Sequence, residues 1–106
     1  MAQQSALTQS TYYILLSLVK ARHGNGIMQM AEQLSEGRIR LAAGTLYGAL
    51  TALCDNGWIR PLPSVEDSRK KEYILTPKGR EVLEVERERL RELVANGENV
   101  LKEEKE

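Results

Sequence analysis

The sequence has few of the side chains that covalent or metal chemistry needs. It contains one cysteine, Cys54, and one histidine, His23, in 106 residues. A single thiol forms no internal disulfide, and one cysteine and one histidine on different segments make neither a metal site nor a converging nucleophile and base. A glycine-rich phosphate loop is also missing from the sequence. We therefore expect no enzyme, cofactor or metal ion, with Cys54 packed in a core and His23 capping a helix C-terminus.

Long apolar runs are missing as well. The longest uninterrupted one, Tyr12 to Leu16, is far too short to cross a bilayer, and no basic segment followed by an apolar run opens the sequence. The apolar fraction of 42% supports one modest core, and 106 residues leave no room for a second folded domain. These features predict a soluble, cytoplasmic protein with no membrane partner.

The net charge of the chain is zero. Taken alone, this disfavours a nucleic-acid partner, because phosphate binding depends on cations. The charges are nevertheless unevenly distributed. Residues 1–37 are balanced, residues 38–71 carry six cations and three anions, and residues 72–106 carry seven cations and ten anions. A basic middle followed by an acidic tail indicates a binding surface joined to an element with a different role.

Apolar residues recur with helical spacing in four segments: residues 8–22, 26–34, 42–56 and from Pro77 onward. Thr8 or Ser10 is expected to cap the first helix, and Thr76 the last. Asn56-Gly57 is expected to end the third helix, and Asn96-Gly97 to end or bend the last. The predicted buried faces are Tyr12, Leu15, Leu16 and Val19 in the first helix, Ile27, Met30, Ala31 and Leu34 in the second, and Leu46, Leu50 and Leu53 in the third.

Two short segments rich in strand-forming residues, 58–62 and 71–75, enclose a polar tip and predict a β-hairpin. Three helices, a hairpin and a final helix are the layout of a winged helix-turn-helix. The expected fold is mainly α with a small β-hairpin: residues 1–76 form the winged helix-turn-helix, and residues 77–106 form a C-terminal dimerisation helix with a charged tail. Both parts are expected to make one structural domain.

The outward face of the third predicted helix carries no charge before Asp55, although a helix that faces only water usually carries lysine and glutamate. In a helix-turn-helix, the third helix enters the major groove of DNA. For the tyrosine on this face, contact with DNA and packing on a neighbouring helix are equal alternatives. The residues expected to face DNA are Gly44, Thr45, Tyr47, Gly48 and Thr51.

Consecutive cations, Arg69, Lys70 and Lys71, close the tip of the predicted hairpin. A wing beside a recognition helix commonly contacts phosphates or the minor groove, so we expect these residues to bind DNA. The alternative is a solvated turn that protects the sheet edge with charge.

Arg38 and Arg40 precede the third helix on one side of a short connector. They are expected to hold the DNA backbone in position. The alternative is a surface salt bridge to Glu32 or Glu36.

The last helix has more leucine and valine on one stripe than a lone surface helix needs, at Val82, Leu83, Leu90, Leu93 and Val94. No later segment of the sequence is available to cover this stripe, so a second copy of the chain is the simplest cover. Packing on the first helix of the same chain is compatible with this, because a helix can be shared between its own domain and a dimer partner.

Five segments occur in a recognisable order: residues 12–18 (YYILLSL), 23–27 (HGNGI), 44–50 (GTLYGAL), 57–59 (GWI) and 73–80 (YILTPKGR). Through them, over about residues 7–95, the chain resembles the PadR family of transcriptional regulators. The resemblance implies a bacterial, dimeric winged-helix repressor that binds double-stranded DNA and leaves it when a small effector binds. It places Thr45, Tyr47 and Gly48 on the DNA-facing helix and Arg69, Lys70 and Lys71 on the wing.

The resemblance also implies that the last helix and the first helix form the dimer, in a region where some relatives hold flat aromatic drugs or phenolic acids. This chain has no phenylalanine, and its last helix has no aromatic residue, so aromatic stacking with a small hydrophobic effector is not expected. The short tail leaves no separate ligand-binding domain. The positions expected in the dimer and effector region are Tyr12, Leu15, Leu83, Leu90, Leu93 and Val94.

A winged-helix module that binds protein rather than DNA is the main alternative, and the zero net charge supports it. Salt separates the two hypotheses, because DNA binding through phosphates weakens steeply with rising salt and an apolar protein contact does not.

Overall fold

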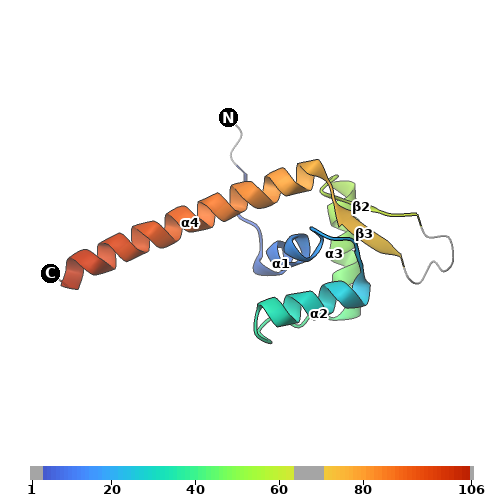
Figure 1. Cartoon of the computed structure of the whole chain (residues 1–106), viewed down its shortest axis with the longest axis horizontal. Helices are drawn as coiled ribbons and strands as arrows, with labels where there is room; N and C mark the ends of the chain where they lie inside the picture. The colour runs from blue at the N-terminus through green and yellow to red at the C-terminus, as the bar shows by residue number, and fades with distance from the viewer. Residues whose placement is uncertain (1–3, 64–70, 106) are drawn as a thin grey trace.

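The computed structural model describes residues 4–63 and 71–105. It confirms a mainly helical winged helix-turn-helix, in which a long C-terminal helix extends away from the rest of the molecule (Figure 1). In chain order the elements are α1 (Gln9–Ser17), β1 (Arg22–His23), α2 (Gly24–Leu34), α3 (Ala43–Asp55), β2 (Ile59–Pro61), β3 (Glu72–Leu75) and α4 (Pro77–Lys105). None of the described helices is long and apolar enough to cross a membrane.

One core lies between the first three helices, the sheet and the start of α4. The inward positions predicted at Leu15, Ile27 and Ala31 are fully buried. Leu46, Leu50 and Leu53 of α3 are buried with them, as predicted. The predictions for Val19 and Leu34 were wrong. Both are exposed: Val19 lies beyond the end of α1 at Ser17, and Leu34 is the last residue of α2, where the helix leaves the core.

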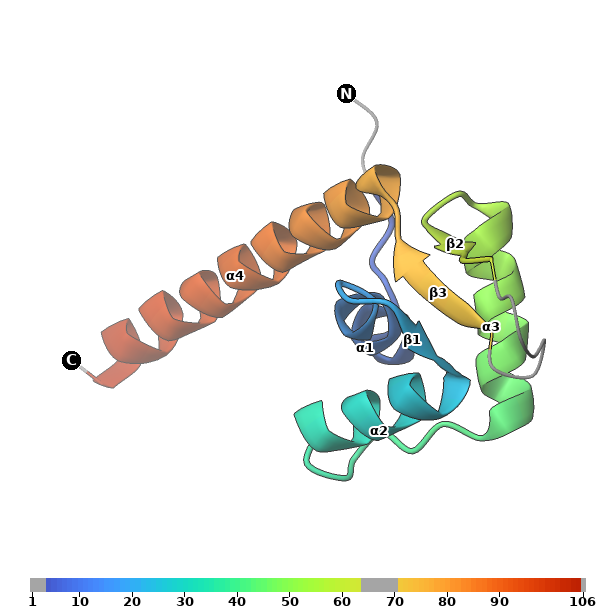
Figure 2. The same ribbon diagram turned by 45° about the vertical axis from the view of Figure 1, so that its right-hand side comes forward.

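The wing is a three-stranded antiparallel sheet with strand order β1-β3-β2, which Figure 2 shows beside α1 and α3. The predicted hairpin is present as β2 and β3, with Ile59 opposite Leu75. The sequence did not predict β1, whose two residues pair with Tyr73 and Glu72. A strand this short has no periodicity of its own, so its pairing depends on β3 lying alongside it.

The predicted helix ends are confirmed at Thr8 and at Asn56-Gly57, and the one predicted at His23 is not. Thr8 caps α1 as predicted, with its hydroxyl accepting from the Thr11 amide at 3.1 Å. Asn56-Gly57 ends α3 as predicted: Gly57 has a φ of 78°, and the Trp58 amide donates to the Leu53 carbonyl at 3.1 Å. His23 caps the N-terminus of α2, where its Nδ1 accepts from the Gly26 amide at 3.4 Å. The prediction of a C-terminal cap was therefore wrong.

The long helix α4 is anchored to the wing at its first turn. The Thr76 hydroxyl accepts from the Gly79 amide at 3.0 Å, as expected of a cap, and donates to the Gly57 carbonyl at 2.6 Å. A Cβ at position 79 would overlap the Trp58 carbonyl, so only glycine fits there. Asn96-Gly97 was expected to end or bend this helix. It does not end the helix, which continues to Lys105. One glycine costs only about 1 kcal/mol, which is small for a helix of 29 residues.

Candidate nucleic-acid interface

The outer face of α3 gathers the five residues that the sequence assigned to it. Gly44, Thr45, Tyr47, Gly48 and Thr51 are all exposed. The Thr51 hydroxyl donates to the Tyr47 carbonyl at 3.0 Å, as threonines do inside helices. Among the described residues, a Cβ added at Gly44 or Gly48 would have no neighbour within 4 Å. Packing within the described part of this protomer therefore gives no reason for either glycine, although Gly48, inside the helix, lowers its stability by about 1 kcal/mol.

Tyr47 both packs against its own protomer and remains accessible. An ideal Cβ built on Gly24 would lie 2.6 Å from the Tyr47 hydroxyl, so the tip of the ring rests on the first residue of α2, and a side chain there would displace the tyrosine. The tyrosine still exposes 49% of its surface. Packing and contact with an outside molecule are thus compatible at this position.

The two arginines before α3 have local partners. Arg40 Nε lies 3.1 Å from Glu32 Oε1, which is one of the salt bridges weighed as an alternative. Arg38 Nε instead donates to the Ser35 carbonyl at 3.3 Å. Both side chains are exposed, and a surface ion pair of this kind contributes only about 0–1 kcal/mol. A phosphate could therefore replace these partners at small cost.

At the wing, Lys71 is exposed just before β3, and it lies close enough to α3 for its charge to act on Cys54. Burial raises the pKa of the Cys54 thiol, which the positive charge of Lys71 partly offsets. Arg69 and Lys70 lie outside the described residues. The sequence argument also passed over Arg60, an exposed cation on β2, because it considered only the tip of the hairpin.

The structure divides the six residues expected in the dimer and effector region. Leu15 and Leu83 are buried in the core of their own protomer, so they are not on the surface that a second copy could contact. Tyr12 and Leu90 are half-buried between α1 and α4. Leu93 and Val94 expose 53% and 57% of their surfaces, and Val100 and Leu101 extend the exposed apolar stripe toward the end of the helix.

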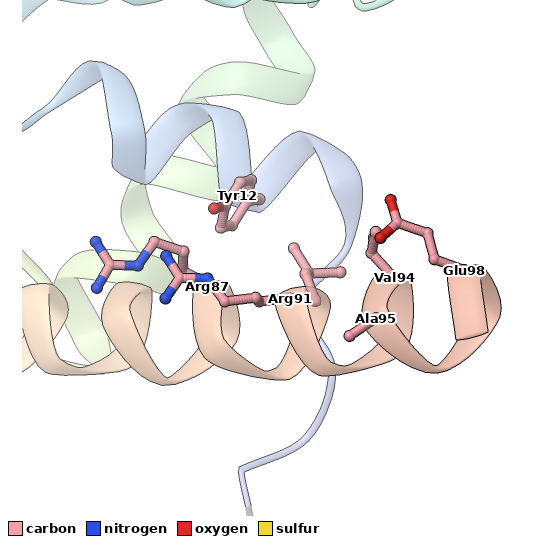
Figure 3. Close-up of a pocket in the computed structure, with 7 residues that line it drawn as sticks. Tyr12, Arg87, Arg91, Val94, Ala95 and Glu98 are labelled. Atoms are coloured by element: carbon pink, nitrogen blue, oxygen red, sulfur yellow. The ribbon is translucent and has the colours of Figure 1, made fainter.

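An open cavity of about 390 Å³ lies between α1 and α4. Figure 3 shows the ring of Tyr12 directed from α1 toward α4. Leu90 and Val94 supply apolar surface, and Arg87, Arg91 and Glu98 supply charge. Among the described residues that line the cavity, Tyr12 alone is aromatic.

The sequence argument missed Glu86, which is only 2% exposed although α4 is exposed on both sides of it. Its Oε1 accepts from Arg89 Nε at 2.7 Å, and its Oε2 accepts from Arg89 Nη2 at 2.8 Å and from the Leu7 amide at 3.0 Å. The hydrogen bond from Arg89, helped by that from Leu7, holds the pKa of Glu86 below its usual range, although burial acts in the opposite direction. Its spacing could have revealed it, since it lies on the apolar stripe between Leu83 and Leu90.

Residues 14–85, from α1 into the first turns of α4, match the family model described as "Transcriptional regulator PadR-like family". Two solved structures show the same fold over most of both chains. A PadR family transcription regulator from Clostridium difficile is 24% identical with a TM-score of 0.69, covering 89% of this chain and 99% of that one. A PadR-like transcription factor from Bacteroides fragilis is 26% identical with a TM-score of 0.65, covering 86% of this chain and 87% of that one.

A curated relative is closer in sequence but much longer. An uncharacterized 37.1 kDa transposon protein of Streptomyces fradiae is 45% identical over 64 residues, which are 60% of this chain and 17% of that protein. The chain thus matches a small part of that relative's length.

Proposed function

Because this chain belongs to the PadR-like family of transcriptional regulators, we propose that it binds specific double-stranded DNA as a homodimer and represses transcription. The uncharged outer face of α3 is the observation that carries this proposal. Its glycines and hydroxyl groups form an exposed surface, and its two glycines have no packing role in the described part of their own protomer. Such a surface suits the floor of the major groove, where base edges are read at close range.

In the proposed complex, base contacts and phosphate contacts come from different elements. Thr45 and Tyr47 offer hydroxyl groups, and Gly44 and Gly48 allow the helix backbone to approach the bases closely. Phosphates are bound from both sides of α3. The proposed phosphate-binding residues are Arg38 and Arg40 before the helix, Arg60 and Lys71 on the described part of the wing, and Arg69 and Lys70 in the tip.

The proposal assigns DNA binding to residues 1–76 and dimerisation to residues 77–106. Leu93, Val94, Val100 and Leu101 expose apolar surface on α4 that a second copy would cover. Burying a leucine or valine side chain stabilises an interface by about 1.5–3 kcal/mol before the costs of association. A dimer would also hold two α3 helices at a fixed separation, as an operator with two half-sites requires.

We extend the proposal to a small, largely apolar effector that relieves repression from the cavity beside Tyr12. The cavity is bounded by both α1 and α4, so an occupant could change how the two helices pack. Its arginines and its single aromatic ring favour polar and apolar contacts over stacking between two rings.

The decisive experiment measures binding to DNA from the region upstream of the chain's own gene, at low and moderate salt, against a scrambled duplex. Sequence-dependent binding that weakens steeply with salt supports the proposal. Equal affinity for both duplexes contradicts it and favours a winged-helix module that binds protein.

Substitutions then separate the two kinds of contact. Lys71→Ala should weaken binding to every duplex and lower the salt slope by about one, whereas Thr45→Ala should change the preference among sequences. Lys102→Ala, which removes an exposed cation far along α4, is the matched control. A Lys71→Ala protein that binds all duplexes as the parent does would contradict the assigned wing contact.

A further inference from the structure

A buried carboxylate on a long, otherwise exposed helix calls for a specific explanation. Burying an ion costs several kcal/mol before its partners repay it, and an apolar side chain of similar size is often equally stable or more stable. Glu86 is nevertheless in this position, and its two oxygens accept three hydrogen bonds from Arg89 and from the Leu7 amide. Packing alone does not require this arrangement.

The carboxylate is one of two points on α4 that accept hydrogen bonds from the segment before α1. Gln4 Nε2 donates to the Val82 carbonyl at 3.1 Å, and four residues farther along α4 the Leu7 amide donates to Glu86. Residues 82 and 86 are one helical turn apart, so the segment formed by residues 4–7 follows one turn of α4 before α1 begins. We call this segment the N-terminal strap.

Because the strap contacts α4 near its start, a small tilt of the helix at this point displaces its far end by a large distance. About 19 residues lie between Glu86 and the end of the helix, a length of about 28 Å at 1.5 Å per residue. Tilting the helix by about 10° around Glu86 would move its end by about 5 Å. That is more than the roughly 3.4 Å rise of one base pair along DNA. Small changes at this point would therefore alter any half-site spacing that α4 sets.

We propose that Glu86, with Arg89 and the strap, is a positioning residue that fixes the angle of α4 to the DNA-binding part and thereby the operator spacing that a dimer accepts. The Arg89 guanidinium, on the same helix, holds the Glu86 carboxylate in one orientation, and the Leu7 amide then joins that carboxylate to the strap. A directional hydrogen bond of this kind specifies one position of α4, whereas apolar contacts tolerate sliding. The spacing part rests on the proposed function, and the angle part does not.

The angle is tested without DNA. Nitroxide labels on Ala52→Cys in α3 and Glu103→Cys in α4, in a Cys54→Ser background diluted with unlabelled protein, report the distance within one chain. Glu86→Leu should broaden or shift this distance distribution by about 5 Å, following the lever estimate. Glu84→Leu, an exposed position on the same helix, should not. A folded Glu86→Leu protein with the parent distribution would overturn the proposal. If Glu86→Leu does not fold, Glu86→Gln and Arg89→Met decide by the same measurement.

The consequence for DNA is tested with duplexes whose half-site spacer varies by one base pair at a time. The parent should prefer one spacing, and Glu86→Leu should lose much of that preference while remaining folded and dimeric. A variant whose affinities all change by one common factor would contradict the positioning role, because a merely structural residue acts in that way. If the parent shows no sequence-dependent binding, the proposed function fails, and the distance measurement still decides the role of Glu86.

Discussion

Replacing Gly48 with alanine should strengthen the fold and weaken DNA binding at the same time. Gly48 lies inside α3 on its outer face, and a Cβ there would meet no described atom within 4 Å. Alanine therefore fits without strain in the free protein. In the proposed complex, the added methyl group projects from the surface that approaches the bases.

The size of the stabilisation follows from helix propensity. Glycine is about 0.8–1.0 kcal/mol less favourable than alanine inside a helix. For a chain of 106 residues, an unfolding entropy of about 2.1 cal/mol/K per residue converts 1 kcal/mol into a rise in Tm of about 4–5 °C. The predicted effect on binding has the opposite sign, because a methyl group inserted into a close interface separates neighbouring contacts.

The assay combines thermal unfolding at one fixed protein concentration with titration of the preferred duplex. Asn99→Ala is the matched control, since it also improves helix propensity at an exposed position but lies far from α3. Only Gly48→Ala should lose affinity, while both variants gain stability. A Gly48→Ala protein that is more stable and binds the duplex as tightly as the parent would refute the placement of this face against DNA.

Three further outcomes are expected. Leu93→Glu should stay folded but become monomeric in sedimentation at concentrations where the parent is a dimer, because burying an unpaired charge in the interface is costly; a dimeric variant would rule out this interface. Gly79→Ala should lower the free energy of unfolding by about 1–3 kcal/mol in urea, because its Cβ overlaps the Trp58 carbonyl, and an unchanged midpoint would contradict that packing. The pKa of Glu86 is lowered in the folded state, so its contribution is complete above the ordinary carboxyl pKa of about 4.3 and is lost as the pH falls further. The difference in unfolding free energy between the parent and Glu86→Gln should accordingly shrink below about pH 4, and an equal difference at pH 3 and pH 7 would argue against the ion pair.

Local signals predicted most of the architecture. Helical spacing located α3 and its buried leucines, and the Thr8, Thr76 and Asn56-Gly57 signals set helix boundaries correctly. The errors lie where local rules compete with tertiary contacts. His23 resembled the end of one helix but begins the next, because β1 pairs with β3 and brings the chain directly into α2.

The candidate DNA-binding face was predictable because it depends on residues of one helix. A regular helix fixes which side chains share a face, so the sequence alone brought Gly44, Tyr47, Gly48 and Thr51 together. The partners of Arg38 and Arg40 were not decided in this way. Each arginine had several acceptors within reach, and only the path of the α2–α3 connector selected Glu32 for one and a backbone carbonyl for the other.

By itself, the sequence determined the order and type of the main elements, the core of α3 and the family resemblance, because these depend on periodicity, caps and short motifs. Only the tertiary structure decided the third strand and the packing of the Tyr47 ring against Gly24. It also decided that Leu15 is buried in the core, apart from the exposed apolar stripe of α4, and that Glu86 is buried. Each of these depends on segments far apart in the chain. Leu7 and Glu86 are separated by 79 residues, and their hydrogen bond forms only when α1 and α4 have packed against the same core.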